Sequence, residues 1–154
     1  MRPYERIIDL LDNSGAEYRT FEHEPVRTSE QAAQVRGTSL AQGAKALVLE
    51  CGDGLVMAVI SASKRVDFKR IKAALGEKRV QMASADRVLE ATGSEPGGVP
   101  PFGNLFNLRV ILDPALLEHE WIDFNAGERT RSIEMRAEDY LRLSGAEVIE
   151  FSKE

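Results

Sequence analysis

The sequence predicts a mixed α/β (α+β) fold, with a mixed β-sheet flanked by helices in a single domain over residues 1–154. Helical and strand patterns alternate without a linker, a repeat or a low-complexity stretch. The apolar runs 44–50 and 55–61 are separated by a short glycine-containing turn, which is typical of an antiparallel hairpin. The length fits one domain, and no apolar run approaches the ~20 residues that span a bilayer.

Start and stop signals place the elements of the first half. An apolar stripe of helical period stops near Gly15, and Thr28 with Gln31 resembles a capping box before a helix that Gly37 ends. Asp67 can cap an amphipathic helix that Gly76 closes. The elements expected here are helices at 3–14, 29–36 and 68–75, and strands at 18–22, 44–50 and 55–61.

The second half repeats this mixture. Ser84 can cap a helix that runs to Gly93, and a glycine–proline loop follows it. Hairpins mixed with helical crossovers favour a mixed sheet over a regular βαβ repeat. The remaining elements expected are strands at 79–82, 109–113, 121–125, 131–136 and 146–151, and a helix at 137–144.

The charge is uneven along the chain. The net charge of −5 argues against a protein that coats nucleic acid indiscriminately. The segment 64–79 carries +5, from seven bases and two acids, so the rest of the chain sums to −10. This segment is either a solvated helix face or a local phosphate-binding patch. The bases expected to contact nucleic acid are Lys64, Arg65, Lys69, Arg70 and Lys72.

Cysteine usage and the first residues bear on location. The single cysteine, Cys51, excludes an internal disulfide and fits a reducing compartment. The first residues lack the apolar region of a signal peptide. We therefore expect a cytoplasmic protein.

Few residues match familiar catalytic or metal motifs. There is no phosphate-binding lysine loop, dinucleotide fingerprint, zinc-protease helix or Cys-x-x-Cys pair. His23 and His119 each lie between two glutamates, and we interpret them as surface or structural residues. Cys51 lies in a turn with no base beside it and is expected to be inert. No metal and no cofactor is therefore expected, while a Ser-His-acid triad stays open, although no nucleophile elbow supports one.

Lys45 and the segment Gly97–Gly103 are the strongest candidates for a site. Strand alternation places Lys45 on the face of Leu47 and Leu49, where an ammonium must reach water, pair with an acid or serve a cavity. The segment Gly97–Gly103 is permissive at its glycines and stiff at its prolines, which suits the presentation of main-chain groups to a small molecule. From the residues alone, a lysine at the strand mouth and a purely structural loop stay open.

Together these residues resemble the YbaK family, the prolyl-tRNA-synthetase-associated trans-editing proteins. The resemblance covers nearly the whole chain in order. It implies a partly barrel-like mixed sheet wrapped by helices around a metal-free cleft that hydrolyses mischarged aminoacyl-tRNA. The segments that carry it are Thr28 with Ala32-Ala33, Ala44–Leu47, Thr92-Gly93, Gly97–Gly103 and Asn125–Gly127.

The resemblance also implies roles for residues. Lys45 matches the lysine that holds the acceptor-end adenosine and the ester, and the backbone of Gly97 and Gly98 matches the loop that orients water or the ester carbonyl. Phe21 and Glu30 fall where the family lines its amino-acid pocket. In place of a serine and an aspartate that some members carry, this chain has Asn125 and Ser132. The full set of expected substrate-binding residues is Phe21, Thr28, Glu30, Val99, Pro100, Pro101, Phe102, Gly103, Asn125, Gly127 and Ser132.

The function expected from this resemblance is a trans-editing aminoacyl-tRNA deacylase, a carboxylic ester hydrolase. Its substrate would be tRNA for proline that carries a small wrong residue, such as alanine, cysteine, serine or threonine. Prolyl-tRNA synthetase is a candidate partner, and no membrane is involved. Two alternatives stay open: a non-catalytic module that binds an acceptor end or a nucleotide beside a synthetase, and a small-molecule-binding domain with a purely structural loop.

Overall fold

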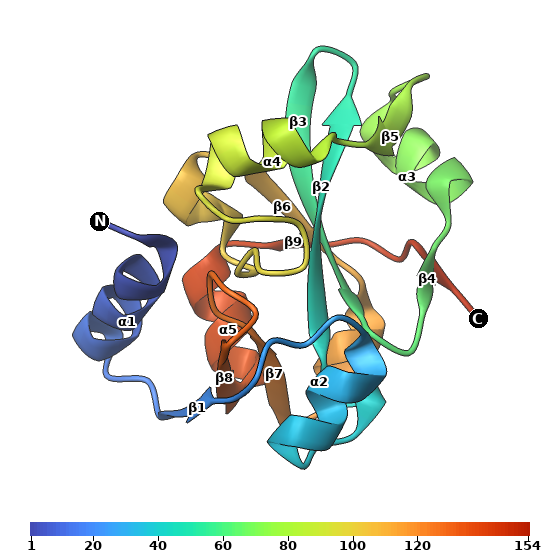
Figure 1. The fold of residues 1–154 in the computed structure, drawn as a ribbon. Helices are drawn as coiled ribbons and strands as arrows, with labels where there is room; N and C mark the ends of the chain where they lie inside the picture. Colours follow the sequence, from blue (N-terminus) through green and yellow to red (C-terminus); the bar gives the residue numbers. More distant parts are fainter.

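The computed structural model describes residues 1–154, in which three sheets are surrounded by helices (Figure 1). Its secondary structure follows the expected order closely. The helices are α1 (Pro3–Ser14), α2 (Ser29–Arg36), α3 (Phe68–Leu75), α4 (Ala85–Thr92) and α5 (Ala137–Ser144), with 3-10 turns η1 (Leu40–Gln42), η2 (Gly103–Phe106) and η3 (Pro114–Glu118). The strands are β1 (Tyr18–Glu22), β2 (Ala44–Cys51), β3 (Gly54–Ser61), β4 (Arg65–Val66), β5 (Val80–Met82), β6 (Arg109–Leu112), β7 (Trp121–Asn125), β8 (Arg131–Arg136), β9 (Glu147–Val148) and β10 (Ser152–Lys153).

The largest sheet is mixed, as expected. Its strand order is β5-β2-β3-β6-β9, with antiparallel pairing from β5 to β3 and parallel pairing from β3 to β9. A second, antiparallel sheet has the order β1-β8-β7, and β4 pairs with β10 in a two-stranded ribbon. None of the three closes on itself, so the partly barrel-like character is limited to the way that the two larger sheets meet. They meet at an isolated parallel bridge between Gly43 and Asp123.

The hairpin β2–β3 carries apolar side chains on both faces because it is covered on both sides. Val48, Met57 and Val59 face the larger core, which also contains residues of α1, β7, β8 and α5. Leu49 and Ile60 face a smaller core closed by α3 and the C-terminal segment. The strand period of two thus divides the hairpin between two apolar layers.

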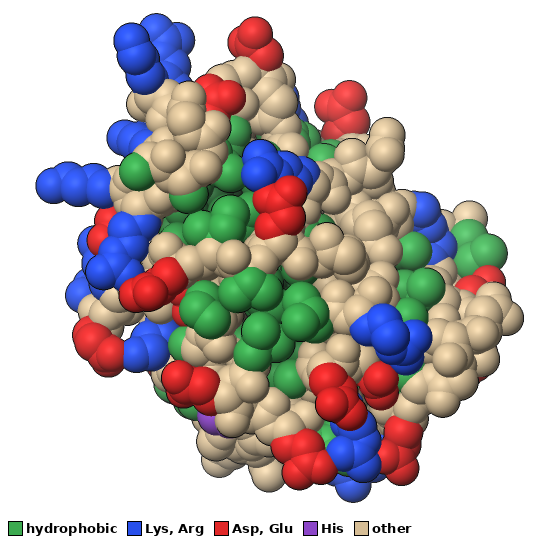
Figure 2. Space-filling model, turned by 180° about the vertical axis from the view of Figure 1, so that it is seen from behind, with side chains coloured by type: hydrophobic (Ala, Val, Ile, Leu, Met, Phe, Trp, Pro, Cys, Tyr) green, Lys and Arg blue, Asp and Glu red, His purple; other side chains and the backbone are tan.

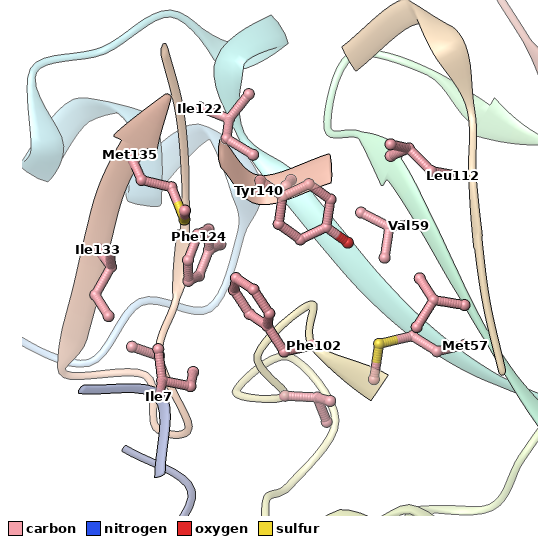
Figure 3. Packing of buried hydrophobic residues seen from close by; sticks show 14 of the residues in the cluster. Ile7, Met57, Val59, Phe102, Leu112, Ile122, Phe124, Ile133, Met135 and Tyr140 are labelled. Carbon is pink, nitrogen blue, oxygen red and sulfur yellow. The ribbon is translucent and has the colours of Figure 1, made fainter. Parts of the chain in front are cut away.

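The larger core is organised around Phe102 (Figure 3). Its ring packs edge-on against Phe124 at 5.8 Å and Tyr140 at 5.1 Å between centroids. The buried Tyr140 hydroxyl donates to the Pro101 carbonyl at 2.6 Å, which satisfies a polar group that would otherwise be costly to bury. The segment after the paired glycines is therefore anchored in the core.

Helix caps follow the sequence signals with one difference. The Thr28 hydroxyl accepts from the Gln31 amide, and Gly37 ends α2 with a φ of 71°. The Gln31 side chain, however, accepts from the amide of Arg27 and not from the cap residue itself, so the capping box is only half formed. No helix in the structure has the length and apolar character that crossing a bilayer requires.

The expected C-terminal strand at 146–151 is wrong in extent. Only Glu147–Val148 pairs with β6, and Ser152–Lys153 pairs with β4 instead. The cause is Asp113, which is 1% exposed and whose Oδ1 accepts from the amides of Phe151 and Ser152 at 2.9 Å each. This carboxylate draws the chain away from the ladder, and Phe151 then enters the smaller core.

Candidate active site

A cleft opens where α2, the start of β2 and two loops come together. The loops are the glycine segment at 97–99 and the stretch that follows β7. The cleft has a volume of about 150 Å³ and is open to solvent. Half of its lining residues are hydrophobic, including Ala32, Ala33 and Leu47. Such a mixture of small apolar groups and a few polar ones is typical of a small-ligand site.

Lys45 lies in this cleft on β2. Its side chain is partly buried, and it forms no hydrogen bond or ion pair with any other residue. The strand register, in which Lys45 stands opposite Ile60, puts it on the side of Leu47 and Leu49, as expected. An ammonium with three unused donors in a cleft is available to oxygen atoms of a ligand.

The charge of the cleft is opposite to that of the protein. Its lining contains Arg27, Arg36, Lys45 and Arg129 and no aspartate or glutamate, although the chain as a whole carries −5. Only Arg36 is neutralised, by an ion pair with Asp123. The cleft therefore favours an anionic ligand.

The glycine loop presents only its first part to the cleft. Gly97 has a φ of 90°, which favours glycine, and both Gly97 and Val99 line the cleft. Gly98 instead turns its main chain inward: its amide donates to Glu95 and its carbonyl accepts from Gly127. The amides of Gly97 and Val99 donate to no protein acceptor, so these two are the free main-chain donors of the part of the loop that lines the cleft.

A buried polar network lies at the base of the cleft. Arg36 of α2 donates from Nε to Ser132 Oγ at 2.8 Å, from Nη1 to Asp123 Oδ1 at 2.7 Å and from Nη2 to Asn125 Oδ1 at 2.7 Å. Asn125 Nδ2 in turn donates to the Gly97 carbonyl at 2.6 Å. His23 Nε2 lies 2.8 Å from Ser132 Oγ, which gives this histidine a structural partner.

Burial and ion pairing have opposite effects on the pKa values of Arg36 and Asp123 in this network. Burial raises the pKa of Asp123 and lowers the pKa of Arg36, because each charged form loses contact with water. The 2.7 Å pairing opposes both shifts. The Thr38 hydroxyl, buried with the pair, also opposes the rise in the pKa of Asp123.

The cleft brings together five of the residues expected to form the site. These are Thr28, Lys45, Gly97, Val99 and Asn125. They come from α2, β2, the glycine loop and β7, so segments far apart in sequence meet at one place. Their roles toward a substrate stay predictions.

The other expected contacts lie outside the cleft lining. Phe21 is on β1, with the guanidinium of Arg19 5.3 Å from its ring centroid, and Glu30 is exposed in the first turn of α2. Ser132 is fully buried and reaches the cleft only through Arg36 and Asn125. Gly127 is packed against the start of α1, where an added Cβ would lie 2.9 Å from the Tyr4 nitrogen.

The second part of the glycine–proline segment belongs to the core. Pro100, Pro101 and Phe102 are buried, and Gly103 is enclosed by β6, where an added Cβ would lie 2.6 Å from a methyl group of Val110. These residues therefore hold the loop in place and do not line the cleft.

The basic segment has a different environment from the cleft. Lys64 pairs with Glu154, Arg70 pairs with Asp67 and Glu150, and Arg65 donates to the Glu154 carbonyl. Along the edge where α3 lies, at the left of Figure 2, acidic side chains stand among the basic ones. In the middle of the same view, apolar side chains gather within a rim of charged groups. Of the expected nucleic-acid contacts, Arg65, Lys69 and Lys72 form no side-chain ion pair, and the side chains of Lys69 and Lys72 form no hydrogen bond either.

Sequence reasoning missed four cleft or network residues. Arg36 and Asp123 were not singled out, because an arginine in a helix and an aspartate in a strand are usually solvent-exposed. Arg27 and Arg129 were missed because they lie in loops with no spacing signal. The one available signal was Asp123 itself, an acid inside the apolar run Trp121–Asn125.

Comparisons with known proteins agree on one family. A family model described as the aminoacyl-tRNA editing domain matches residues 23–143. A relative from Escherichia coli (strain K12), the multifunctional Ser/Thr-tRNA deacylase ProXp-y, is 37% identical over 97% of this chain and 93% of its own length. A proline–tRNA ligase from Thermosipho melanesiensis is 31% identical over 74% of this chain, and the matched region is 20% of that ligase.

A solved structure supports the same assignment. It is described as a candidate trans-editing enzyme for prolyl-tRNA synthetase and superposes with a TM-score of 0.88 at 26% identity. The match covers 100% of this chain and 99% of the other. The mixed arrangement of sheets and helices expected from the sequence is thereby confirmed as that of a trans-editing domain.

Proposed function

The chain belongs to the aminoacyl-tRNA editing domain family, and we propose on this premise that it is a trans-editing deacylase that hydrolyses the ester bond of mischarged aminoacyl-tRNA. One observation supports this most strongly. The unpaired ammonium of Lys45 and two loop residues with free amides, Gly97 and Val99, line one cleft whose charged lining residues are all cationic. An acceptor end is anionic at its phosphates and bears a labile ester, and this cleft offers complementary groups for both.

The reaction needs little beyond positioning. A water molecule attacks the ester carbonyl carbon, the carbonyl becomes an oxyanion, and the bond to the terminal ribose oxygen breaks to release the amino acid. The amides of Gly97 and Val99 are the free donors for the oxyanion or the attacking water. Lys45 holds ribose, ester or phosphate oxygens. A neighbouring ribose hydroxyl can carry the proton to the leaving oxygen, so no strong general base is required.

The substrates we propose are tRNAs that carry a small wrong residue. A synthetase pocket rejects a smaller or near-isosteric amino acid only weakly, since one methylene changes binding by ~1–3 kcal/mol. Serine and threonine esters come first, because the Escherichia coli relative is named for them. Alanine and cysteine esters on tRNA for proline follow. Prolyl esters should be spared, because the ring does not fit a pocket shaped for a small residue.

The working unit that we propose is the whole of residues 1–154. The family match begins at residue 23, yet Ile7 and Leu11 of α1 are fully buried in the core that contains Phe102. We also propose prolyl-tRNA synthetase as a partner, since related domains are found within proline–tRNA ligases. Co-purification of the two proteins at physiological salt tests this second point.

The direct test is ester hydrolysis. Purified protein and a Lys45→Ala variant are incubated with tRNA for proline, serine or threonine charged with alanine, cysteine, serine, threonine or proline. Rapid loss of a wrong ester, with proline spared and the variant inactive, would establish the activity and name the substrate. If every ester survives while the tRNA still binds, the protein is a binding module and the proposed reaction is wrong.

A further inference from the structure

Arg36 uses all three of its nitrogen atoms on three different residues. The partners are Ser132 and Asp123, both 0% exposed, and Asn125, which lines the cleft, all at 2.7–2.8 Å. Arg36 itself is 9% exposed. A guanidinium can make these bonds together because its donors form a rigid planar fork, whereas an ammonium is a single point charge.

The third of these bonds determines how Asn125 points. Because the Asn125 oxygen accepts from Arg36 Nη2, its amide nitrogen faces the opposite direction, where it donates to the Gly97 carbonyl at 2.6 Å. Without a cation on one side, an asparagine amide could present either its oxygen or its nitrogen to the loop. Arg36 therefore selects the orientation that binds the loop.

The same bond clamps one peptide plane of the glycine loop. The carbonyl of Gly97 is held by Asn125, and the amide of Gly98 in the same peptide is held by Glu95. The neighbouring amides of Gly97 and Val99 are the ones without a protein acceptor. Fixing the central peptide thus fixes the direction in which the free donors point.

This network is costly for a purely structural feature. A buried ion pair gains little over apolar residues of equal volume, because both charged groups must be removed from water. Apolar packing between α2 and β7 would join the same elements without that cost, but it would not orient Asn125.

We propose that Arg36 is a positioning residue of the deacylation site, acting through Asn125 on the Gly97 carbonyl. This inference rests on the proposed function for its kinetic consequence and on the geometry alone for its structural one. Arg36 secures the glycine loop in the orientation that presents its free amides, so its loss affects the rate of the chemical step more than the binding of tRNA.

Two substitutions test the two contacts separately, the one from Arg36 to Asn125 and the one from Asn125 to Gly97. Arg36→Lys keeps a positive charge beside Asp123 but cannot reach three partners, and Asn125→Asp still accepts from Arg36 but cannot donate to Gly97. Each should lower kcat about tenfold to a hundredfold, the size of effect that a small misplacement of a site produces, with KM within about twofold. The kcat of the double variant should fall no further than that of the more damaging single variant, since both substitutions interrupt the same series of contacts.

A matched control shows whether an Arg→Lys substitution at an ion-paired arginine outside the cleft has any effect of its own. Arg136 is another ion-paired arginine, with Glu120 and Glu17 as its partners, but it is not among the residues that line the cleft. Arg136→Lys should leave kcat and KM unchanged. Thermal unfolding of all variants identifies any that do not fold, and Asn125→Asp, which keeps the pair of Arg36 with Asp123, remains informative if Arg36→Lys is unstable.

A measurement without substrate keeps this inference separate from the proposed function. Amide resonances of Gly97, Gly98 and Val99 in ¹⁵N-labelled protein should shift in both Arg36→Lys and Asn125→Asp and stay in place in Arg136→Lys. If these amide resonances shift but the wild type hydrolyses no ester, the positioning of the loop by Arg36 is supported and the proposed deacylase activity is wrong. Unshifted glycine resonances in Arg36→Lys, or additive kinetic losses in the double variant, would overturn the positioning role.

Discussion

The cleft and the basic segment 64–79 are both positively charged, yet they differ in what surrounds their charges. In the cleft, Lys45 has no acidic partner, and its lining includes no carboxylate. In the basic segment, Lys64 and Arg70 are paired with acids of the C-terminal residues. The excess of +5 in the sequence therefore overstates what the segment offers to a phosphate.

The comparison teaches that unpaired charge beside a hollow is a better guide to anion binding than the number of bases along a stretch of chain. An exposed ion pair contributes little to stability, but a phosphate must displace or share the acid to use its cation. The first variant below removes an unpaired charge from the cleft, and the last one removes acidic partners from the bases of the segment.

The largest effect is expected from Lys45→Ala. Loss of one group that stabilises developing charge typically costs about 10²–10³-fold in rate, so kcat/KM for the wrong ester should fall at least about a hundredfold. Because the Lys45 side chain makes no hydrogen bond or ion pair within the protein, the melting temperature should hardly change. Ester hydrolysis and thermal unfolding measure the two effects. Lys69→Ala, an unpaired lysine outside the cleft, is the control, and equal losses in both variants would contradict the comparison.

The next effect is expected from Arg27→Ala combined with Arg129→Ala. If these cleft arginines bind acceptor-end phosphates, KM for tRNA should rise about tenfold, and the slope of log affinity against log salt should become less steep by about 0.7 for each phosphate that is no longer neutralised. Steady-state kinetics at several salt concentrations test this. Arg142→Ala, an exposed arginine paired with Asp139, should change neither quantity. An unaltered salt slope in the double variant would remove these arginines from the interface.

A smaller effect is expected when Lys69, Arg70 and Lys72 are changed together to alanine. KM for tRNA should rise only about twofold to threefold, with a slight flattening of the salt dependence, because Arg70 is already engaged with Glu150 and Asp67. A rise larger than that of the cleft double variant would reverse the comparison. No change in KM or slope would make this segment a solvated helix face.

The smallest effect is expected from releasing the bases of the segment. Glu150→Gln with Glu154→Gln frees Lys64 from its carboxylate and leaves Arg70 with Asp67 as its one acidic partner. The affinity for tRNA should increase about twofold, and the salt dependence should steepen. Fluorescence titration of uncharged tRNA at low and moderate salt measures both. Unchanged affinity would mean that this edge does not meet the nucleic acid even when its bases are free.

The local elements could be predicted well because their signals are local. Thr28 and Gly37 bound α2, and the glycines around Asp53 turn the hairpin, as their conformational preferences require. The last strand could not be predicted correctly. Its end depends on the Asp113 carboxylate, which captures two amides from a segment almost forty residues away.

The candidate site was predictable in part for the same reason. Lys45 and Gly97 stand out by local pattern, a lysine on an apolar strand face and a paired glycine. Arg36 carries no such signal, because its role depends on partners on β7 and β8 that only the fold brings near. Pro100 to Gly103 lie in the core and not in the cleft lining, because a stiff apolar segment suits a core as well as a loop, and their expected contacts with a ligand stay predictions.

The pairing of β1 with β8 has a consequence for how the protein is made. Strand β1 can pair only after β8 has been synthesised, and Arg36 can bond to Asn125 only after β7 has been synthesised. The polar network of the cleft therefore cannot form until most of the chain exists. Closing such distant segments is slow relative to forming a hairpin such as β2–β3. During that interval the apolar face of α1 and the open edge of β1 lack their partners and are liable to aggregate. We therefore expect the newborn chain to gain activity only after nearly all of it has been synthesised.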